Sequence, residues 1–489
     1  MKKLVLLLLV PFITYGQVQI GQDIDGEAAG DASGRNVSLS SNGTIIAIGA
    51  FRNDDNGEDA GHVRVYQNQN GNWIQIGEDI DGEGSEDLFG FSVKLSSDGS
   101  ILAVGAPDNN NENGENAGHV RVYQNQNENW VQIGEDINGE NSNDFSGTSI
   151  GLSSNGDIVA IGAPSNNGNG SSSGHVRIYE NNNGTWTQIG QDINGESSGD
   201  FSGQNISLSD NGTILAIGAD QNDGNGSNSG HVRVYENQGG TWVQIGQDID
   251  GENQGDFSGF STSLSSDGTI LAIGAVFNNG NSSISGHARV YENQGGTWIQ
   301  IGQDIDGENQ GDDFGFNLSL SSDGTILAVG ARLHDGNGSN SGQVRIYRNQ
   351  EGNWIQIGNN INGENPGDFS GLGISLSSTG EEVAIGAIRN NDNGNQSGHV
   401  RVFDLSDLLS TEEFISSNFS LYPNPATTQV TIEIPQESTL EKITIYNSLG
   451  QQVLSSKETT ITTSTLSQGV YIVEVKTNQG ISSKKLIVE

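Results

Sequence analysis

The sequence predicts an all-β protein: a seven-bladed β-propeller with about 56 residues per blade, followed by a small immunoglobulin-like β-sandwich. Three observations predict this fold. One unit recurs seven times, each unit holds four short β-rich segments, and no segment has the 3.6-residue periodicity of an amphipathic helix. The six tryptophans mark the repeat, because they follow one another at spacings of 56 or 57 residues.

The four segments are clearest in the unit that begins near residue 257, where they span 261–264, 269–275, 287–291 and 297–302. The turn between the first two segments is Asp267-Gly268, and Asn-Gly or Asp-Gly occupies this turn in six of the seven units. These dipeptides supply the positive φ angles of a type I′ hairpin. Each unit is therefore predicted to be a four-stranded antiparallel sheet, the blade of a propeller.

The first and last units indicate how the ring closes. The last unit ends at Phe403 and lacks its tryptophan strand, while residues 18–21 match residues 243–246 of an inner unit. We therefore expect the N-terminal strand to complete the last blade of a propeller spanning 17–403, which would cover the edge that an open array exposes. A linear solenoid is the alternative, and it would need capping units at both ends.

The N-terminal 16 residues have the composition of a secretory signal peptide. Lys2 and Lys3 precede the apolar run 4–10, and the small residue Gly16 follows. The apolar run is too short to span a bilayer, and no other segment approaches that length. The sequence therefore predicts export without a transmembrane segment.

Charge and composition exclude several classes of function. The net charge is −41, and residues 18–417 hold 55 acidic against 13 basic side chains. Such a polyanion gains nothing from counterion release, so nucleic acid is excluded as a partner. The absence of cysteine excludes disulfides, thiol catalysis and cysteine-based metal sites. Two interpretations of the acidity stay open: a solvated surface, or cation binding.

A recurring acidic stretch, D-I-D/N-G-E-x3-D, makes calcium the candidate cation. Asp, Asn and Gly also form turns without any ion, so a purely structural role stays open. We expect the repeated histidines to start strands, the repeated arginines to form ion pairs within blades, and the tryptophans to pack blade against blade. The candidate calcium ligands are Asp79, Asp81, Glu83, Asp87, Asp248, Asp250, Glu252 and Asp256.

The repeat resembles the FG-GAP family of integrin α-subunits and many bacterial surface proteins. The residues that carry the resemblance are Phe89-Gly90 followed by Gly105-Ala106-Pro107, and most other units have F-S-G and G-A. The resemblance covers about residues 18–403 and implies a seven-bladed adhesive or ligand-binding propeller. Integrin-type repeats carry an acidic calcium loop between their first two strands, which is absent here, so that calcium site is not expected.

After Phe403 the repeat stops. Residues 404–417 form a polar linker with room for one helical turn, and residues 418–489 contain four β-rich segments at 430–434, 442–446, 470–475 and 484–488. This last domain resembles a type A C-terminal sorting domain of the type IX secretion system of Bacteroidota. The matching residues are Tyr422, Pro423, Asn424, Pro425, Gly450, Gly469, Tyr471, Lys484 and Lys485.

The resemblance implies that the chain contacts the type IX secretion machinery and reaches the outer-membrane surface or the extracellular space. An unrelated adhesive sandwich is the alternative. The chain lacks the G-x-S-x-G, H-E-x-x-H and phosphate-loop motifs, so we expect no enzyme but a binding or adhesion protein for a glycan or protein ligand. A passive surface-layer role and a polysaccharide-acting enzyme with a carboxylate pair remain alternatives.

Two slots vary between otherwise near-identical blades, and both lie on the face formed by the loops after strands two and four. The first slot is the single residue that follows F-S-G or its equivalent at the start of the innermost strand. The second slot is the pair of residues that follows G-A at the end of the second strand. Packing is the same in every blade and does not explain this variety, whereas Phe and Arg are residue types that anchor partners. Drift at exposed loop ends is the alternative. The candidate ligand-binding residues are Arg35, Phe91, Phe260, Phe316, Phe51, Arg52, Phe277, Arg332, His334 and Arg389.

Overall fold

A computed structural model describes residues 16–409, 419–434, 439–447, 450–477 and 480–489. The chain divides into two units, Met1–Leu408 and Leu409–Glu489. The predicted signal peptide lies outside the described residues except for Gly16.

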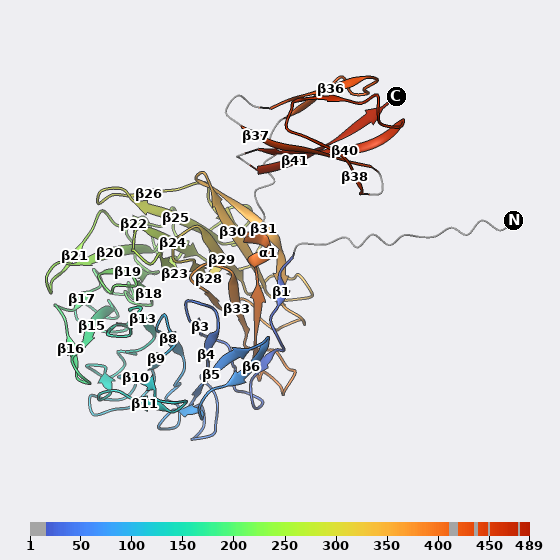
Figure 1. Cartoon of the computed structure of the whole chain (residues 1–489). Coiled ribbons are helices and arrows are strands. Elements are labelled where there is room, and N and C mark those ends of the chain that lie inside the picture. The colour runs from blue at the N-terminus through green and yellow to red at the C-terminus, as the bar shows by residue number, and fades with distance from the viewer. Residues whose placement is uncertain (1–15, 410–418, 435–438, 448–449, 478–479) are drawn as a thin grey trace. The chain divides into compact units, whose positions relative to one another are not determined.

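The first unit is a ring of seven antiparallel sheets around a central channel (Figure 1). Within each sheet four strands follow one another from the channel outward, as the repeat predicted. The innermost strands are β3 (Val37–Leu39), β8 (Ser92–Leu95), β13 (Ser149–Leu152), β18 (Asn205–Leu208), β23 (Ser258–Leu264), β28 (Phe314–Leu320) and β32 (Gly373–Leu376). The second strands are β4 (Ile45–Ala50), β9 (Ile101–Ala106), β14 (Ile158–Ala163), β19 (Ile214–Ala219), β24 (Ile270–Ala275), β29 (Ile326–Ala331) and β33 (Glu382–Ala387).

The third strands begin at the repeated histidine or its replacement. They are β5 (His62–Gln69), β10 (His119–Asn125), β15 (His175–Asn181), β20 (His231–Asn237), β25 (His287–Asn293), β30 (Gln343–Gln350) and β34 (His399–Asp404). The outer strands are β6 (Asn72–Gln75), β11 (Trp130–Gln132), β16 (Trp186–Gln188), β21 (Trp242–Gln244), β26 (Trp298–Gln300), β31 (Asn353–Asn362) and β1 (Val18–Gln19).

The acidic stretch after each outer strand is more regular than the sequence predicted. In six sheets it forms a two-residue strand that pairs with the third strand, and in the sheet of β30 it is the end of β31. The two-residue strands are β2 (Ile24–Asp25), β7 (Ile80–Asp81), β12 (Ile137–Asn138), β17 (Ile193–Asn194), β22 (Ile249–Asp250) and β27 (Ile305–Asp306).

The N-terminal strand closes the ring, as predicted. β1 pairs antiparallel with β34, with Val18 opposite Asp404 and Gln19 opposite Phe403. Gln17 stands where the other outer strands carry tryptophan, and its side chain bonds to the backbone of Asn359. Six sheets therefore carry a tryptophan at or near the start of the outer strand, and the seventh carries Gln17 at the equivalent position.

Neighbouring blades approach closely at two glycines that give the repeat its motif. A Cβ on Gly49 of β4 would lie 2.0 Å from the carbonyl oxygen of Gly90 in the next blade. Gly90 has a φ of +89°, which residues with side chains rarely adopt. The glycine of G-A and the glycine of F-G are thus required by the same contact between blades.

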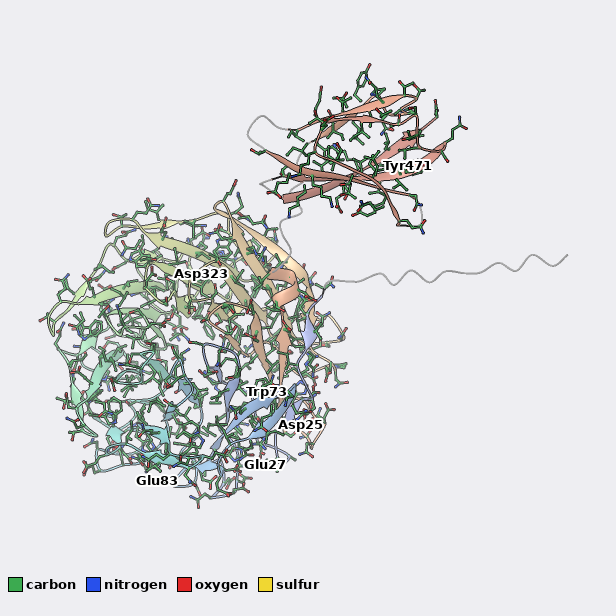
Figure 2. All side chains as sticks on the ribbon, viewed as in Figure 1. Asp25, Glu27, Trp73, Glu83, Asp323 and Tyr471 are labelled. Carbon is green, nitrogen blue, oxygen red and sulfur yellow. The ribbon has the colours of Figure 1, made fainter. Side chains whose placement is uncertain are left out.

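The tryptophans join successive blades, as predicted. Trp73 Nε1 donates a 2.9 Å hydrogen bond to the carbonyl of Ile20 in the preceding sheet, and the ring packs beside Ile24 (Trp73 is labelled in Figure 2). The other five make the same bond at 2.9–3.2 Å. Each pairing satisfies the only donor of an indole ring, and it buries the ring fully in four blades and partly at Trp130 and Trp186.

A second ring of bonds surrounds the channel at the S-S-D-G turns. The amide of each second turn residue donates to the carbonyl of its equivalent in the next blade at 2.8–2.9 Å, and Ser378 donates to Ser41 to complete the circle. The members are Ser41, Ser97, Ser154, Asp210, Ser266, Ser322 and Ser378. The ring is therefore closed at the channel as well as at its outer edge.

The propeller extends past its predicted end at Phe403. Helix α1 (Ser406–Leu409) follows β34, and Leu405 and Leu408 are buried. A Cβ on Gly358 would meet the side chains of Leu408 and Gln17, where the equivalent Gly302 faces Trp354. The start of the predicted linker thus fills the place of the missing tryptophan, and residues 410–418 lie outside the described residues. None of the helices in the described part of the chain is both long and apolar enough to cross a membrane.

The second unit contains two antiparallel sheets with one hydrophobic core between them. One sheet is formed by β35 (Ser420–Tyr422), β36 (Gln429–Glu433) and β39 (Thr460–Thr462). The other is formed by β38 (Gln452–Ser456), β37 (Leu440–Asn447), β40 (Gly469–Thr477) and β41 (Gly480–Val488). Val430 and Ile432 of the first sheet pack with Ile443, Ile445 and Val473 of the second. This arrangement is the predicted small β-sandwich.

We predict that a chain starting at Gln22 is less stable than one starting at Gln17 by about 3 kcal/mol. It loses two or three backbone hydrogen bonds to β34 and the partial burial of Ile20. Urea unfolding of the first unit measures the difference. Val18→Thr is the control, because that side chain is 59% exposed and its loss should leave the midpoint unchanged. An equal midpoint for the truncated chain would contradict a stabilising role for β1.

Candidate functional site

Seven different side chains meet at one end of the central channel, where they help to line a cavity of about 180 Å³. Each stands near the start of an innermost strand, within two residues of its first position, in the first of the two variable slots. The structure thereby brings together four of the predicted ligand-binding residues. The seven residues, which we call the channel mouth, are Arg35, Phe91, Thr148, Gln204, Phe260, Phe316 and Leu372.

Arginine and phenylalanine side chains stack on one another at the channel mouth. The Arg35 guanidinium carbon lies 3.9 Å from the centroid of the Phe91 ring, and Phe51 packs edge-on against Phe91 at 5.8 Å. The rings of Phe260 and Phe316 lie 4.9 Å apart, and the guanidinium of Arg332 stacks over Phe316 at 3.8 Å. Stacking on a ring face holds each guanidinium in place while its N–H groups stay free to donate.

The two stacked arginines differ in their ion pairs. Arg332 Nε donates a 3.0 Å bond to Asp313, a buried carboxylate. Arg35 forms no ion pair with any described residue, and burial together with the charges of Arg332 and Arg52 lowers its pKa to about 10. The channel mouth therefore holds a positive charge that the protein itself does not neutralise.

The second variable slot divides into two kinds of position. Its first residue turns toward the channel mouth, as Phe51 and Arg332 do. Its second residue stacks on the rim of its own blade instead: Arg389 over Phe369 at 4.3 Å, and Phe277 on Phe257 at 5.1 Å. The cavity itself is not lined by any of the predicted ligand-binding residues of this slot: Phe51 and Arg332 contact it only through Phe91 and Phe316, and Arg52, Phe277 and Arg389 lie farther out.

His334 is also away from the cavity. Its ring lies 3.3 Å from the side-chain nitrogen of Gln343 and 3.6 Å from a carboxylate oxygen of Glu308, and the residue is 8% exposed. It stands where other blades carry asparagine, in the one blade whose third strand begins with glutamine instead of histidine. The sequence prediction grouped it with the ligand-binding residues because it follows the variable slot.

An acidic side chain occupies the second slot in the fourth blade. Asp220 is 4% exposed, and burial raises its pKa to about 7 despite backbone hydrogen bonds to the carboxylate. The rim is thus electrically asymmetric, with arginines in some blades and this carboxyl group in another.

The predicted calcium ligands do not converge in groups of four. Asp79 Oδ2 lies 3.8 Å from His62, whereas Glu83 pairs with Arg121 of the next blade. Asp87 is buried and accepts bonds from the Gly84 amide and the Asn109 side chain, while Asp81 is exposed. One acidic stretch therefore serves several separate contacts, because the short strand in its middle turns successive carboxylates in different directions.

The second predicted group repeats this division. Asp248 lies in a cluster with His231, Glu252 pairs with Arg289 at 3.6 Å, and Asp256 bonds to the Asn278 side chain. Asp250 is exposed.

Each repeated arginine pairs with a glutamate of the preceding unit, which corrects the expectation of pairs within one blade, and Arg121 also forms the expected pair within its own sheet, with Asp136. Arg64 of β5 lies 3.4 Å from Glu27, whose preceding strand β2 belongs to the neighbouring sheet. Arg64 also donates a 2.6 Å bond to the carbonyl of Asp25. Figure 2 shows Asp25, Glu27 and Glu83 at successive places around the ring. The charged residues of the repeat thus reinforce the contact between sheets.

Sequence reasoning missed a charged pair at the other end of the channel. Lys94 and Asp210 line a cavity of about 140 Å³ among the serines of the S-S-D-G turns. Lys94 is open to the channel yet surrounded by the ring, and this burial lowers its pKa while Asp210 offsets part of the effect. The signal was present in the sequence, because Lys94 is the single lysine of residues 18–417 and Asp210 replaces a serine of the repeat.

The sorting-motif residues gather on one edge of the second unit. The Asn424 side chain donates to the carbonyl of Lys485 at 2.8 Å and accepts from the amide of Ile487 at 2.9 Å. Lys484 donates to the carbonyl of Phe419, and Tyr471 donates to the carbonyl of Ser467. Tyr422 is 74% exposed, which leaves its ring accessible to a partner.

Comparison with protein families finds one match in each unit. Residues 420–489 match the model of a secretion system C-terminal sorting domain, and residues 306–347 match that of the FG-GAP repeat. The chain carries an FG-GAP repeat and a C-terminal sorting domain. The predictions of an FG-GAP propeller and a type IX sorting domain are thereby confirmed. The sorting domain implies contact with the secretion machinery and export to the cell surface or the extracellular space.

No curated protein matches the chain. Among solved structures it resembles the periplasmic gluconolactonase PpgL of Pseudomonas aeruginosa, with 14% identity, a TM-score of 0.45, and coverage of 67% of this chain and 84% of that one. It also resembles the Dos1 propeller, with 12% identity, a TM-score of 0.45, and coverage of 79% and 95%. These distant likenesses carry no argument about function.

We predict that Asp220→Asn stabilises the propeller increasingly as the pH rises from 4 to 8. The folded state keeps the Asp220 proton up to about pH 7, whereas the unfolded chain releases it near pH 4. The wild type therefore loses stability as the pH rises through this window, and the asparagine variant escapes that loss. Melting temperatures at about pH 4, 5.5, 7 and 8 measure the effect. A gain that is constant across this range would contradict the raised pKa.

Proposed function

We propose that the propeller is a binding module that takes an anionic group of an extracellular glycan or protein ligand at the channel mouth. The observation that carries the proposal is Arg35. It is stacked on Phe91, unpaired with any described carboxylate, and turned into a cavity in a protein of net charge −41.

The distribution of the other bases supports an anionic ligand. Seven of the 13 bases in residues 18–417 belong to the repeat. Of the other six, Arg35 lies at the channel mouth, Arg332 stacks on Phe316, Arg52 and Arg389 stack on phenylalanines of the rim, Lys94 lies in the channel, and Arg348 donates to the carbonyl of Leu408 away from it. A guanidinium presents paired donors that match a carboxylate, sulfate or phosphate group.

The phenylalanines supply the second part of a binding surface. Phe260 and Phe316 offer ring faces that suit the apolar face of a sugar or an apolar side chain. The cavity volume of about 180 Å³ admits a terminal group rather than a whole chain. We therefore expect the ligand to insert one charged end.

The cavity favours binding over cleavage. Glycoside hydrolysis requires two carboxyl groups facing the scissile bond. Among the described residues that line the channel mouth there is neither Asp nor Glu. A passive surface role would not require the symmetry-breaking arginines to gather at one end of the channel.

We predict that Arg35→Met weakens binding of an anionic ligand at least tenfold without lowering the melting temperature, since Arg35 has no ion pair to lose. Phe260→Ala combined with Phe316→Ala should weaken it similarly. Arg332→Ala is less informative, because it leaves the buried Asp313 unpaired. The measurement is a glycan and protein array with the purified propeller, including uronic-acid and sulfated glycans beside neutral ones.

The matched control is Asp323→Asn in the turns of the opposite face (labelled in Figure 2), because three blades carry asparagine there naturally. It should leave binding unchanged. Equal losses in the control and in Arg35→Met would place the ligand elsewhere, and saturable binding of neutral glycans alone would contradict the anionic class.

We predict that deletion of residues 418–489 abolishes surface display, because the second unit carries the sorting motif. The exported but unsorted chain should accumulate in the periplasm with its signal peptide removed. Surface immunolabelling and fractionation of cells measure this outcome. Normal display of the truncated chain would contradict the sorting role.

A further inference from the structure

The contacts between blades bring histidines and carboxylates together in repeated clusters. Each cluster joins the histidine that starts a third strand, an aspartate of the same sheet and a glutamate from the preceding unit. Two clusters contain a third carboxylate and are called the four-group clusters here. They consist of Glu27, Asp55, His62 and Asp79, and of Asp23, Glu364, Asp392 and His399.

The histidine of each four-group cluster is fully buried, and neither ring nitrogen of His62 or His399 has a hydrogen-bond partner among the described residues. His399 Nδ1 lies 3.7 Å from Asp23, 3.9 Å from Asp392 and 4.0 Å from Glu364. These separations exceed a hydrogen bond. They match the roughly 3 to 4 Å between two ligands that each lie about 2.1 to 2.4 Å from one ion.

We propose that each four-group cluster binds one divalent first-row metal ion such as Zn²⁺ or Mn²⁺, with one imidazole nitrogen and three carboxylate oxygens as ligands. An imidazole among carboxylates suits these ions, whereas calcium takes oxygen ligands. The charge also fits. Arg64 and Arg401 each pair with one carboxylate of their cluster, so two negative charges remain for the ion.

Hydrogen bonds hold the carboxylates in the required orientation. Gln75 donates to Oδ1 of Asp79 at 2.6 Å, which leaves Oδ2 facing His62. Gln19 donates in the same way to Asp23. Bonds of this kind to the outer atom of a ligand are typical of metal sites.

One blade has lost the imidazole and the carboxylate together. In the sixth unit Gln343 replaces the histidine and Asn360 replaces the aspartate, and Gln356 still donates to Asn360 at 2.7 Å. The blade therefore folds with two amides in place of the two ligands. In several other blades a glycine such as Gly168 stands where the four-group clusters have their third carboxylate. In the second blade Arg121 donates two hydrogen bonds to Asp136, the aspartate of that cluster.

The two four-group clusters flank the closure of the ring. Asp23 lies between β1 and β2, and Glu27 follows β2, so both belong to the N-terminal segment that completes the last sheet. Bound ions would fasten this segment to β34 on one side and to β5 on the other. The inferred role is to stabilise the closed ring after export.

Titration of the untagged chain starting at Gln17, freed of metal by chelator, tests the proposal. Calorimetry with Zn²⁺ alone should show two sites per chain, and the melting temperature should rise with Zn²⁺ and fall again with chelator. Asp55→Asn with Asp392→Asn, and His62→Gln with His399→Gln, should each weaken both sites at least tenfold. The glutamine variants copy the natural sixth blade and should fold.

His175→Gln is the matched control, because it makes the same change in a cluster with only two carboxylates. It should leave the two sites intact. The proposal would be overturned by the absence of Zn²⁺ binding, by Zn²⁺ binding that is equal in all variants, or by tight Ca²⁺ binding that Zn²⁺ does not displace. None of these outcomes depends on the ligand of the channel mouth.

Discussion

Contact between neighbouring blades is the constraint on which this structure depends. One hydrophobic cluster contains Val63 and Val65 of the first blade together with Leu102 and Val104 of the second. The carbonyl of Gly90 reaches so close to Gly49 that a side chain would not fit there. A single four-stranded sheet could not cover both of its faces. The ring must therefore close, and closure places the N-terminal strand beside the C-terminal one.

The contact between blades also limits the positions at which a binding site can form. Sevenfold packing holds each blade to one pattern, so a site needs a position that packing leaves free. The channel mouth is such a position, because its residues line a cavity at the end of the channel and differ from blade to blade. The clusters between blades are another, because a third carboxylate such as Asp55 enters them from a loop without disturbing the sheet.

The sequence predicted the repeat, the strands and the closing strand, and it placed on one face the four variable residues that the structure brings together at the channel mouth. These predictions were possible because the chain contains seven near-identical units, and their comparison shows which positions vary and which are the same in every blade. The grouping of Glu27 with His62 and Asp79 was not predictable in this way, since Glu27 follows a strand of the neighbouring sheet and reaches the other two only when the ring is built. The prediction grouped His334 with the variable slot, whereas the structure places its ring against Gln343, which follows it in the next strand of the same blade.

The charge of the protein limits the ligand further. At physiological ionic strength a charge is felt over about 8 Å. A ligand end at Arg35 therefore experiences the positive channel mouth, while the rest of the ligand lies over a surface that is strongly acidic. A densely anionic polymer would be repelled along its length even if one group bound well. Under the proposal of an anionic ligand at the channel mouth, both charges favour a ligand that is mostly neutral and carries its negative charge at an end or on an isolated branch.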